Sequence, residues 1–360
     1  MPFPGHATAE GTDRFRARTS CPEAHFHKIG DQFWSSVGIG TYMGERDDET
    51  NRIVADAVFT SVKGGINVID SASNYRSERA EKSVGRALSR LIEDKHCNRD
   101  ELVICTKGGY LPFGAPGFLS DVAGKVGEVA EHDMVANGHC MHPDYLEWQM
   151  NRSLEHLGLD CIDVYYVHNP EAQAGKIEER VFDQRLEAAF RFLQGAVKDG
   201  KIRAYGIASW NAFRLTPDNP AHMSLQKAKS IARRAANGGR DHFHFIQLPV
   251  NLAALEGLRL PNQMVGRDAF PAVRAALTLG IRTISSGSIG QAKIPELSEE
   301  LRLKLGANLN DYQRALQFTR SAPAIATALV GMKQTEHVLK NLEVCNRPPL
   351  TPTQARALYS

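Results

Sequence analysis

The sequence lacks the cysteine spacing of a disulfide framework or a zinc site. Its six cysteines are scattered, and no two of them form a CxxC pair: Cys21, Cys97, Cys105, Cys140, Cys161 and Cys345. This distribution favours reduced thiols in an intracellular protein. The run His139-Cys140-Met141-His142 offers imidazoles and a thiol, but no second ligand pair stands at zinc spacing. We therefore predict a polar loop there and no metal site.

Long apolar runs and an excess of one charge are also missing. No apolar run approaches the roughly 18 residues of a membrane span, and the first residues show no basic region followed by an apolar stretch. The 43 basic residues nearly balance the 41 acidic ones, for a formal net charge of +2. We therefore expect neither a nucleic-acid nor a membrane partner. A cytoplasmic protein is the expectation.

The length and composition are those of a globular protein. The chain has 360 residues, of which 42% are hydrophobic and 23% charged. This length allows two ordinary domains or one large α/β barrel. Residues 1–24 are polar, rich in arginine and interrupted by glycine and proline, so we predict a polar N-terminal tail or irregular lid. We expect residues 25–360 to form a single domain.

A pattern of amphipathic helix, glycine and short apolar strand recurs along the chain. It predicts strands at residues 36–41, 66–70, 102–107, 162–168, 202–209, 243–250, 281–285 and 325–330. Glycines such as Gly158 and Gly280 precede the strands, as is typical where a helix ends in the left-handed conformation. Eight such units predict a (β/α)8 barrel, that is, a TIM barrel.

Three long segments follow predicted strands, at residues 110–141, 251–268 and 286–310. The side of a barrel where strands lead into helices carries the active site. We therefore predict long loops at the C-terminal face of the strands that form the wall of a pocket. A disordered linker is the alternative for the first of them.

Polar residues stand at the ends of three predicted strands. They are Asp70, Lys107 and His168, with Tyr75 just beyond Asp70. Because side chains alternate along a strand, each shares a face with the apolar residues before it. If these faces point inward, the polar ends meet at one mouth. The set contains no nucleophile with its base and no metal cage, so it suits protonation of a carbonyl oxygen while a nicotinamide supplies the hydride.

The charges in this set predict how its acid works. A free phenol has a pKa of about 10. The ammonium of Lys107, kept charged by Asp70, is predicted to lower the pKa of Tyr75 toward the range of general acid catalysis. His168 is predicted to donate a hydrogen bond to the carbonyl oxygen and fix its orientation.

Candidate phosphate-binding segments follow the seventh and eighth strands. They are Ser286-Gly287-Ser288-Ile289-Gly290 and Gly331-Met332-Lys333-Gln334, where barrels usually bind phosphate. A Rossmann site is the alternative, because Gly38-Ile39-Gly40 with Gly44 resembles a dinucleotide fingerprint. Its spacing departs from GxGxxG, and its glycines precede the helix.

Taken together, residues 36–345 resemble an aldo-keto reductase. The family's tetrad falls on Asp70, Tyr75, Lys107 and His168. The matching motifs are Gly40-Thr41-Tyr42, residues 67–72 followed by Asn74-Tyr75, Thr106-Lys107, residues 163–168, Gly206-Ile207-Ala208-Ser209-Trp210, Gln247, and Gly331-Met332-Lys333-Gln334 with His337 and Asn341. The resemblance implies a (β/α)8 barrel and an extended nicotinamide cofactor, with NADP(H) preferred and NAD(H) as the alternative.

The resemblance also implies roles for single residues. Ser209 and Gln247 would hold the carboxamide, Lys333 would meet the 2′-phosphate, and His337 and Asn341 would border the adenine. Further cofactor contacts are expected from Gly40, Thr41, Tyr42, Asp70, Ser286, Gly287, Ser288, Gly331 and Met332. A small-molecule carbonyl or alcohol substrate would meet Tyr42, Tyr110, His168, Asn169 and Trp210, a lining that suits sugars, aryl aldehydes and terpenoid ketones alike.

Two departures from the family pattern concern the nicotinamide. Ala208-Ser209 stands where the family often has Ser-Asn or Ser-Arg, and Ile284-Ser285-Ser286 stands where a stacking tyrosine is common. The expected activity is carbonyl reduction with Tyr75 as the acid, or the same chemistry run toward oxidation. A nucleotide-binding regulatory subunit, like the channel-associated members of the family, is the alternative from another class.

Overall fold

Eight parallel strands form a closed barrel in the computed structural model, which describes residues 1–112, 122, 126–136 and 138–359. Around the barrel the strands follow in the order β11, β12, β3, β4, β5, β6, β7 and β8. They are β3 (Val37–Gly40), β4 (Val68–Asp70), β5 (Val103–Gly108), β6 (Ile162–His168), β7 (Ile202–Ala208), β8 (Phe243–Pro249), β11 (Arg282–Ser286) and β12 (Ile325–Gly331). The predicted TIM barrel is confirmed.

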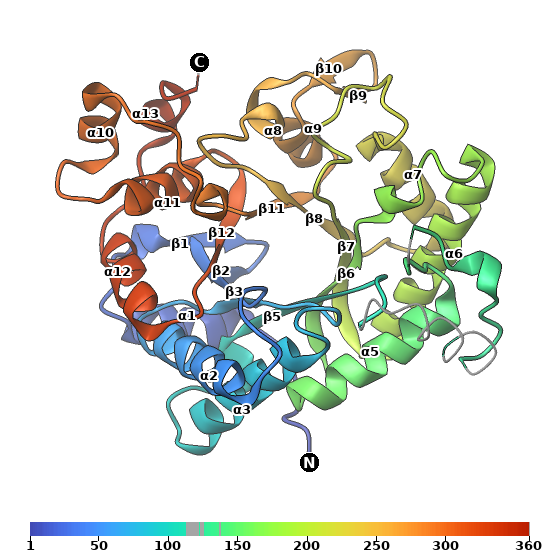
Figure 1. The fold of residues 1–360 in the computed structure, drawn as a ribbon, viewed down its shortest axis with the longest axis horizontal. Helices are drawn as coiled ribbons and strands as arrows, with labels where there is room; N and C mark the ends of the chain where they lie inside the picture. The colour runs from blue at the N-terminus through green and yellow to red at the C-terminus, as the bar shows by residue number, and fades with distance from the viewer. Residues whose placement is uncertain (113–121, 123–125, 137, 360) are drawn as a thin grey trace.

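Helices surround the strands as an outer ring (Figure 1). They include α2 (Asp48–Lys63), α3 (Arg79–Glu93), α5 (Pro143–Leu157), α6 (Glu179–Lys198), α7 (Leu225–Ala235), α9 (Ala272–Thr278), α11 (Asp311–Ser321) and α12 (Thr335–Cys345). Helix α5 ends at Gly158 with φ 68°, and Gly280, after α9, has φ 73°. The left-handed glycines predicted at these two positions are therefore present.

The long loops contain further elements. Residues 251–268 include α8 (Glu256–Arg259) and β9 (Gln263–Val265), which pairs antiparallel with β10 (Asp268–Phe270). Residues 286–310 include α10 (Glu299–Gly306). Within residues 110–141, Tyr110 and His139 form an antiparallel bridge, while residues 113–121, 123–125 and 137 lie outside the described part. A short helix, α13 (Pro352–Arg356), follows α12.

The N-terminal region is an ordered part of the barrel's base. The sequence predicts an irregular tail at residues 1–24, whereas the structure has α1 (Ala9–Arg18), with Phe15 fully buried. Few other apolar side chains lie on this helix, which explains why its amphipathic pattern is weak. Strands β1 (Phe26–Ile29) and β2 (Gln32–Ser35) form a hairpin, and Trp34 on β2 stacks on Phe245 at 5.2 Å between ring centroids.

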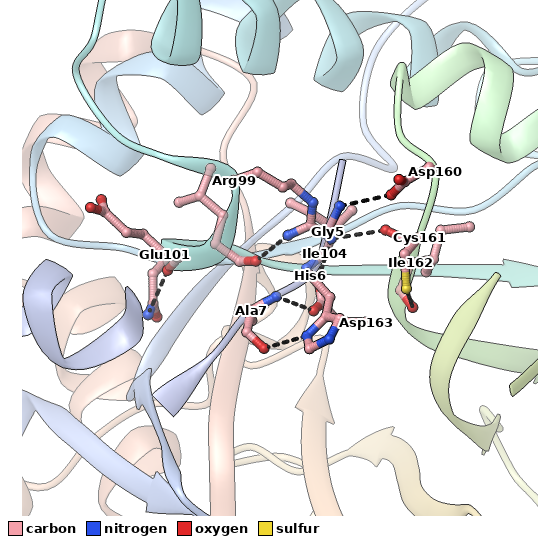
Figure 2. Close-up of polar contacts among 12 residues, drawn as sticks. Gly5, His6, Ala7, Arg99, Glu101, Ile104, Asp160, Cys161, Ile162 and Asp163 are labelled. Atoms are coloured by element: carbon pink, nitrogen blue, oxygen red, sulfur yellow. Dashed lines mark hydrogen bonds and ion pairs between the residues drawn. The ribbon is translucent and has the colours of Figure 1, made fainter. Parts of the chain in front are cut away.

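Residues before α1 are joined to the barrel by hydrogen bonds (Figure 2). The backbone N–H of Gly5 donates to Asp160 Oδ1 at 2.9 Å, and that of Ala7 donates to Asp163 Oδ1 at 2.7 Å. The other oxygen of Asp163 accepts hydrogen bonds from Arg99 and from the N–H of Ile104, each at 2.8 Å. The first residues of the chain thus lie against the ends of β5 and β6 that face away from the predicted mouth.

Candidate active site

The strand ends bring the predicted polar residues together. Asp70 ends β4, Lys107 precedes the last residue of β5, and His168 ends β6. The residues two positions earlier on these strands lie in the cluster that fills the barrel interior: Val68, Cys105 and Tyr166. The side chains therefore alternate as the sequence predicts, and the three polar ends lie on the inner face.

Lys107 connects the members of this set. Its Nζ donates to Asp70 Oδ1 at 2.5 Å, to the carbonyl oxygen of Ser71 at 2.7 Å and to the hydroxyl of Tyr75 at 3.3 Å. The ring of Tyr75 meets that of His168 edge to face, with centroids 5.8 Å apart. Four side chains from separate parts of the chain thus surround one small volume.

Burial changes the ionisation of this set. It raises the pKa of Tyr75 above its ordinary value, and the ammonium of Lys107 only partly opposes that shift. Lys107 does lower the pKa of Tyr75, as predicted, but the net shift is upward, because desolvation of the phenolate exceeds the attraction of the ammonium. Burial, with the charge of Lys107, also lowers the pKa of His168 well below 6.5, so its imidazole is neutral.

Lys107 itself stays protonated. Burial lowers the pKa of Lys107, but the charge of Asp70 and the hydrogen bonds to Asp70 and Tyr75 outweigh it and leave that pKa raised. Gln247 on β8 supports the pair from the other side, since its Nε2 donates to Asp70 Oδ2 at 2.9 Å. Gln247 therefore has Asp70 as a hydrogen-bond partner within the protein. The family resemblance implies the nicotinamide carboxamide as a further partner.

Glu171 is a buried carboxylate that sequence reasoning misses. Its Oε1 accepts hydrogen bonds from Ser209 Oγ at 2.7 Å and from the backbone N–H groups of Trp210 at 3.0 Å and Asn211 at 3.1 Å. Ser209 Oγ also accepts from Ala212 N at 2.7 Å. The hydroxyl proton of Ser209 is therefore already committed to Glu171, and Glu171 fixes the turn that follows β7.

His139 is a second supporting residue that the sequence does not reveal. Its Nε2 lies 2.7 Å from the carbonyl oxygen of His168, and its Nδ1 lies 3.1 Å from Gln173 Nε2. The ring of Tyr110 packs edge to face on both His139 and His168, at 4.9 and 5.5 Å. The end of the first long loop is thus built against the candidate site, and residues 139–141 are buried where the sequence predicts a polar loop.

A cavity of about 940 Å³ opens beside the tetrad and extends to α12. Residues of the predicted sites that line it are Gly40, Thr41, Tyr42, Asp70, Tyr75, Tyr110, His168, Asn169, Trp210, Gln247, Ser286, Gly287, Ser288, Gly331, His337 and Asn341. Lining residues for which the sequence predicts no cofactor or substrate contact include Met43, Asn74, Asn310, Tyr312 and Lys340. Asn310 is the last residue of the third long loop and Tyr312 lies in the first turn of α11, so the end of this loop reaches the cavity.

Three predicted cofactor residues lie outside the cavity lining: Ser209, Met332 and Lys333. Met332 is 1% exposed and packs in the main hydrophobic core, so its side chain makes no contribution to the wall. Ser209 is 4% exposed and faces Glu171. Lys340 instead places an ammonium group on the lining, and its Nζ pairs with Glu336 at 2.8 Å.

The described part of the chain contains neither a metal-binding cluster nor a membrane-spanning helix. No group of three or more His, Cys, Asp or Glu side chains in this part of the chain could hold a metal ion. No helix in the same part is long and apolar enough to cross a membrane.

The chain is similar to proteins of known sequence over most of its length. A Schizosaccharomyces pombe protein named "Putative voltage-gated potassium channel subunit beta" is 25% identical over 293 residues, covering 78% of this chain and 75% of that protein. The uncharacterized oxidoreductase YqkF of Bacillus subtilis is 24% identical over 330 residues, covering 91% and 92%.

The fold has solved counterparts. The structure of an aldo/keto reductase from Klebsiella pneumoniae in complex with NADP and acetate matches with a TM-score of 0.58 and 17% identity, covering 91% of each chain. The family model described as "Aldo/keto reductase family" matches residues 36–217, half of the chain. The chain therefore belongs to the aldo/keto reductase family.

Proposed function

We propose that the chain is an NADP(H)-dependent oxidoreductase that interconverts aldehydes or ketones and the corresponding alcohols. Tyr75 is the general acid in reduction and the general base in oxidation. The observation that carries this proposal is the 3.3 Å contact between Lys107 Nζ and the hydroxyl of Tyr75 beside neutral His168, at one end of a large cavity. NAD(H) is the alternative cofactor.

The cavity suits a dinucleotide. Its volume of about 940 Å³ lies at the upper end of the range for ligand pockets. It runs from Tyr75 past residues 286–288 to His337 and Asn341, so one extended ligand can reach both ends. Gln247 and Ser286 are candidates to hold the nicotinamide end, and His337, Lys340 and Asn341 the adenosine end. When bound, the nicotinamide supplies or accepts the hydride.

The protein's part in the reaction is proton transfer. In reduction, neutral His168 donates a hydrogen bond to the carbonyl oxygen, and Tyr75 gives its proton to the same oxygen. The phenolate that remains lies beside the ammonium of Lys107, which Asp70 keeps in place. In oxidation this phenolate takes the proton of the alcohol. Proton transfer by a positioned side chain contributes about 10² to 10⁴ in rate.

The variant Tyr75→Phe tests the proposal. We expect NADPH-dependent reduction of a carbonyl panel to fall by about 10² to 10⁴, the contribution of general acid catalysis. NADPH affinity, measured by fluorescence titration, should stay the same because only the hydroxyl is lost. Reduction at the wild-type rate would exclude Tyr75 as the acid.

A regulatory subunit is the second candidate, because one relative is named as a potassium channel subunit beta. In that case the cavity binds nucleotide without rapid turnover. Association with a larger partner in a native extract, together with no activity on the carbonyl or alcohol panels, would favour this function.

A further inference from the structure

Three consecutive residues directly after Tyr75 have left-handed backbone conformations. The φ angles are 50° for Arg76, 54° for Ser77 and 68° for Glu78. A residue with a Cβ atom is strained in this conformation, since the Cβ comes close to the following carbonyl oxygen. A run of three such residues persists only where the surroundings hold it in place.

Arg76 holds one side of this turn. Its side chain is buried, with 5% of the residue exposed. Nη1 donates to Asn51 Oδ1 on α2 at 2.9 Å, and Nη2 donates to Ser83 Oγ on α3 at 2.9 Å. The guanidinium therefore joins the turn to two helices of the outer ring.

Glu78 holds the other side. Its two carboxylate oxygens accept hydrogen bonds from Nε and Nη2 of Arg152 on α5, each at 2.6 Å. The Glu78 side chain is 4% exposed. A bidentate pair of this kind fixes orientation as well as distance. Ser77, between them, differs because its buried hydroxyl has no hydrogen-bond partner among the described residues.

The turn lies between the phenol and α3. The N–H of Ala80 donates to the carbonyl oxygen of Tyr75 at 3.3 Å, and the N–H of Tyr75 donates to that of Ala72 at 3.1 Å. We infer that Arg76 and Glu78 are positioning residues for Tyr75, with Arg152 as the partner of Glu78. Their side chains keep the strained turn in place and thereby the phenol beside Lys107. This inference rests on the proposed function of Tyr75.

The variant Arg152→Met tests the inference, because Arg152 does not line the cavity. We expect kcat for carbonyl reduction to fall by about 10- to 100-fold, as small displacements of a reacting group do. The dissociation constant for NADPH should stay within about twofold, and Arg152→Lys should recover part of kcat. The matched control is Arg90→Met on α3, which breaks an exposed ion pair with Asp56 and should leave kcat unchanged.

Hydrogen exchange of the ligand-free protein gives a readout without activity. Amides of residues 71–80 should exchange faster in Arg152→Met than in the wild type, and Ser77→Gly should raise Tm because it removes strain and keeps both side-chain contacts. The inference would be overturned if Arg152→Met kept both the wild-type kcat and the wild-type rates of amide hydrogen exchange. The inference would also be overturned if Arg152→Met lost kcat and NADPH affinity by the same factor and Arg152→Lys recovered none of the kcat. If Tyr75→Phe stays active, the proposed function fails, while the exchange result still decides whether the turn is held.

Discussion

Asp163 and Arg99 form a buried ion pair at the base of the barrel, with Nη2 of Arg99 2.8 Å from Oδ2 of Asp163 and both side chains at most 5% exposed. The same carboxylate accepts hydrogen bonds from the N–H groups of Ala7 and Ile104. One side chain on β6 therefore joins the N-terminal segment, β5 and the residues before β5.

Replacing Asp163 by alanine should lower the free energy of unfolding by about 3 to 5 kcal/mol, because it leaves a buried arginine without its partner. Urea denaturation measures the change. The control is Asp160→Ala, which removes an exposed carboxylate that bonds Gly5 and should cost about 1 kcal/mol. If Asp163→Ala and Asp160→Ala lowered the free energy of unfolding by similar amounts, the buried ion pair would contribute no more to stability than an exposed hydrogen bond.

Stability should fall as the pH drops below about 6.5. Burial lowers the pKa of His25 to about 3 and that of His139 to about 4, and it also lowers the pKa of His168. Between these values and the unfolded pKa of about 6.5, the unfolded chain binds more protons, so stability rises with pH and is fully present above 6.5. Tm measured from pH 5 to 8 checks this. His139→Gln should make the dependence shallower, and a flat wild-type profile would contradict the assignment.

The two directions of the proposed reaction should depend differently on pH. Burial raises the pKa of Tyr75 above 10 and lowers that of His168, so the phenol is protonated and the imidazole neutral from about pH 6.5 to 10. Values of kcat/KM for reduction should be constant over this range. Oxidation needs the phenolate and should become faster with increasing pH. Steady-state rates in both directions measure this, and an oxidation rate independent of pH would contradict it.

Removing the carboxylate of Glu171 should weaken substrate binding. Glu171→Ala takes away the acceptor for Ser209 and for the N–H groups of Trp210 and Asn211, so the turn beside the cavity loses its fixed position. We expect KM for the carbonyl substrate to rise about tenfold, equivalent to about 1.4 kcal/mol. Steady-state kinetics measures it, with exposed Glu178→Ala as the control. An unchanged KM would assign Glu171 to folding alone.

The barrel and the positions of the tetrad could be predicted because their signals are local. Alternating side chains and helix-ending glycines fix strands within a few residues, and parallel strands then bring Asp70, Lys107 and His168 to one rim. The partners of these residues could not be predicted in the same way. Glu171 and His139 act on residues from other loops, so no spacing in the sequence marks them.

Three predictions differ from the structure, each for a physical reason. The pKa of Tyr75 depends on how completely folding removes water from the phenol. The sequence does not reveal the extent of that burial. The side chain of Met332 lies in the main hydrophobic core on the same face as Ala328 and Val330 of β12, so it points away from the cavity. Helix α1 is missed because one buried aromatic residue, Phe15, carries most of its packing.

The hydrogen bonds between residues 3–7 and residues 158–163 also bear on how the protein folds during synthesis. The backbone N–H groups of Phe3, Gly5 and Ala7 find their acceptors only after residues 158–163 have been synthesised. The barrel can close only later, because β3 pairs with β12, which ends at residue 331. Until residue 331 has been synthesised, the nascent chain therefore carries an unpaired β3 edge, and chaperone binding would matter most in this period.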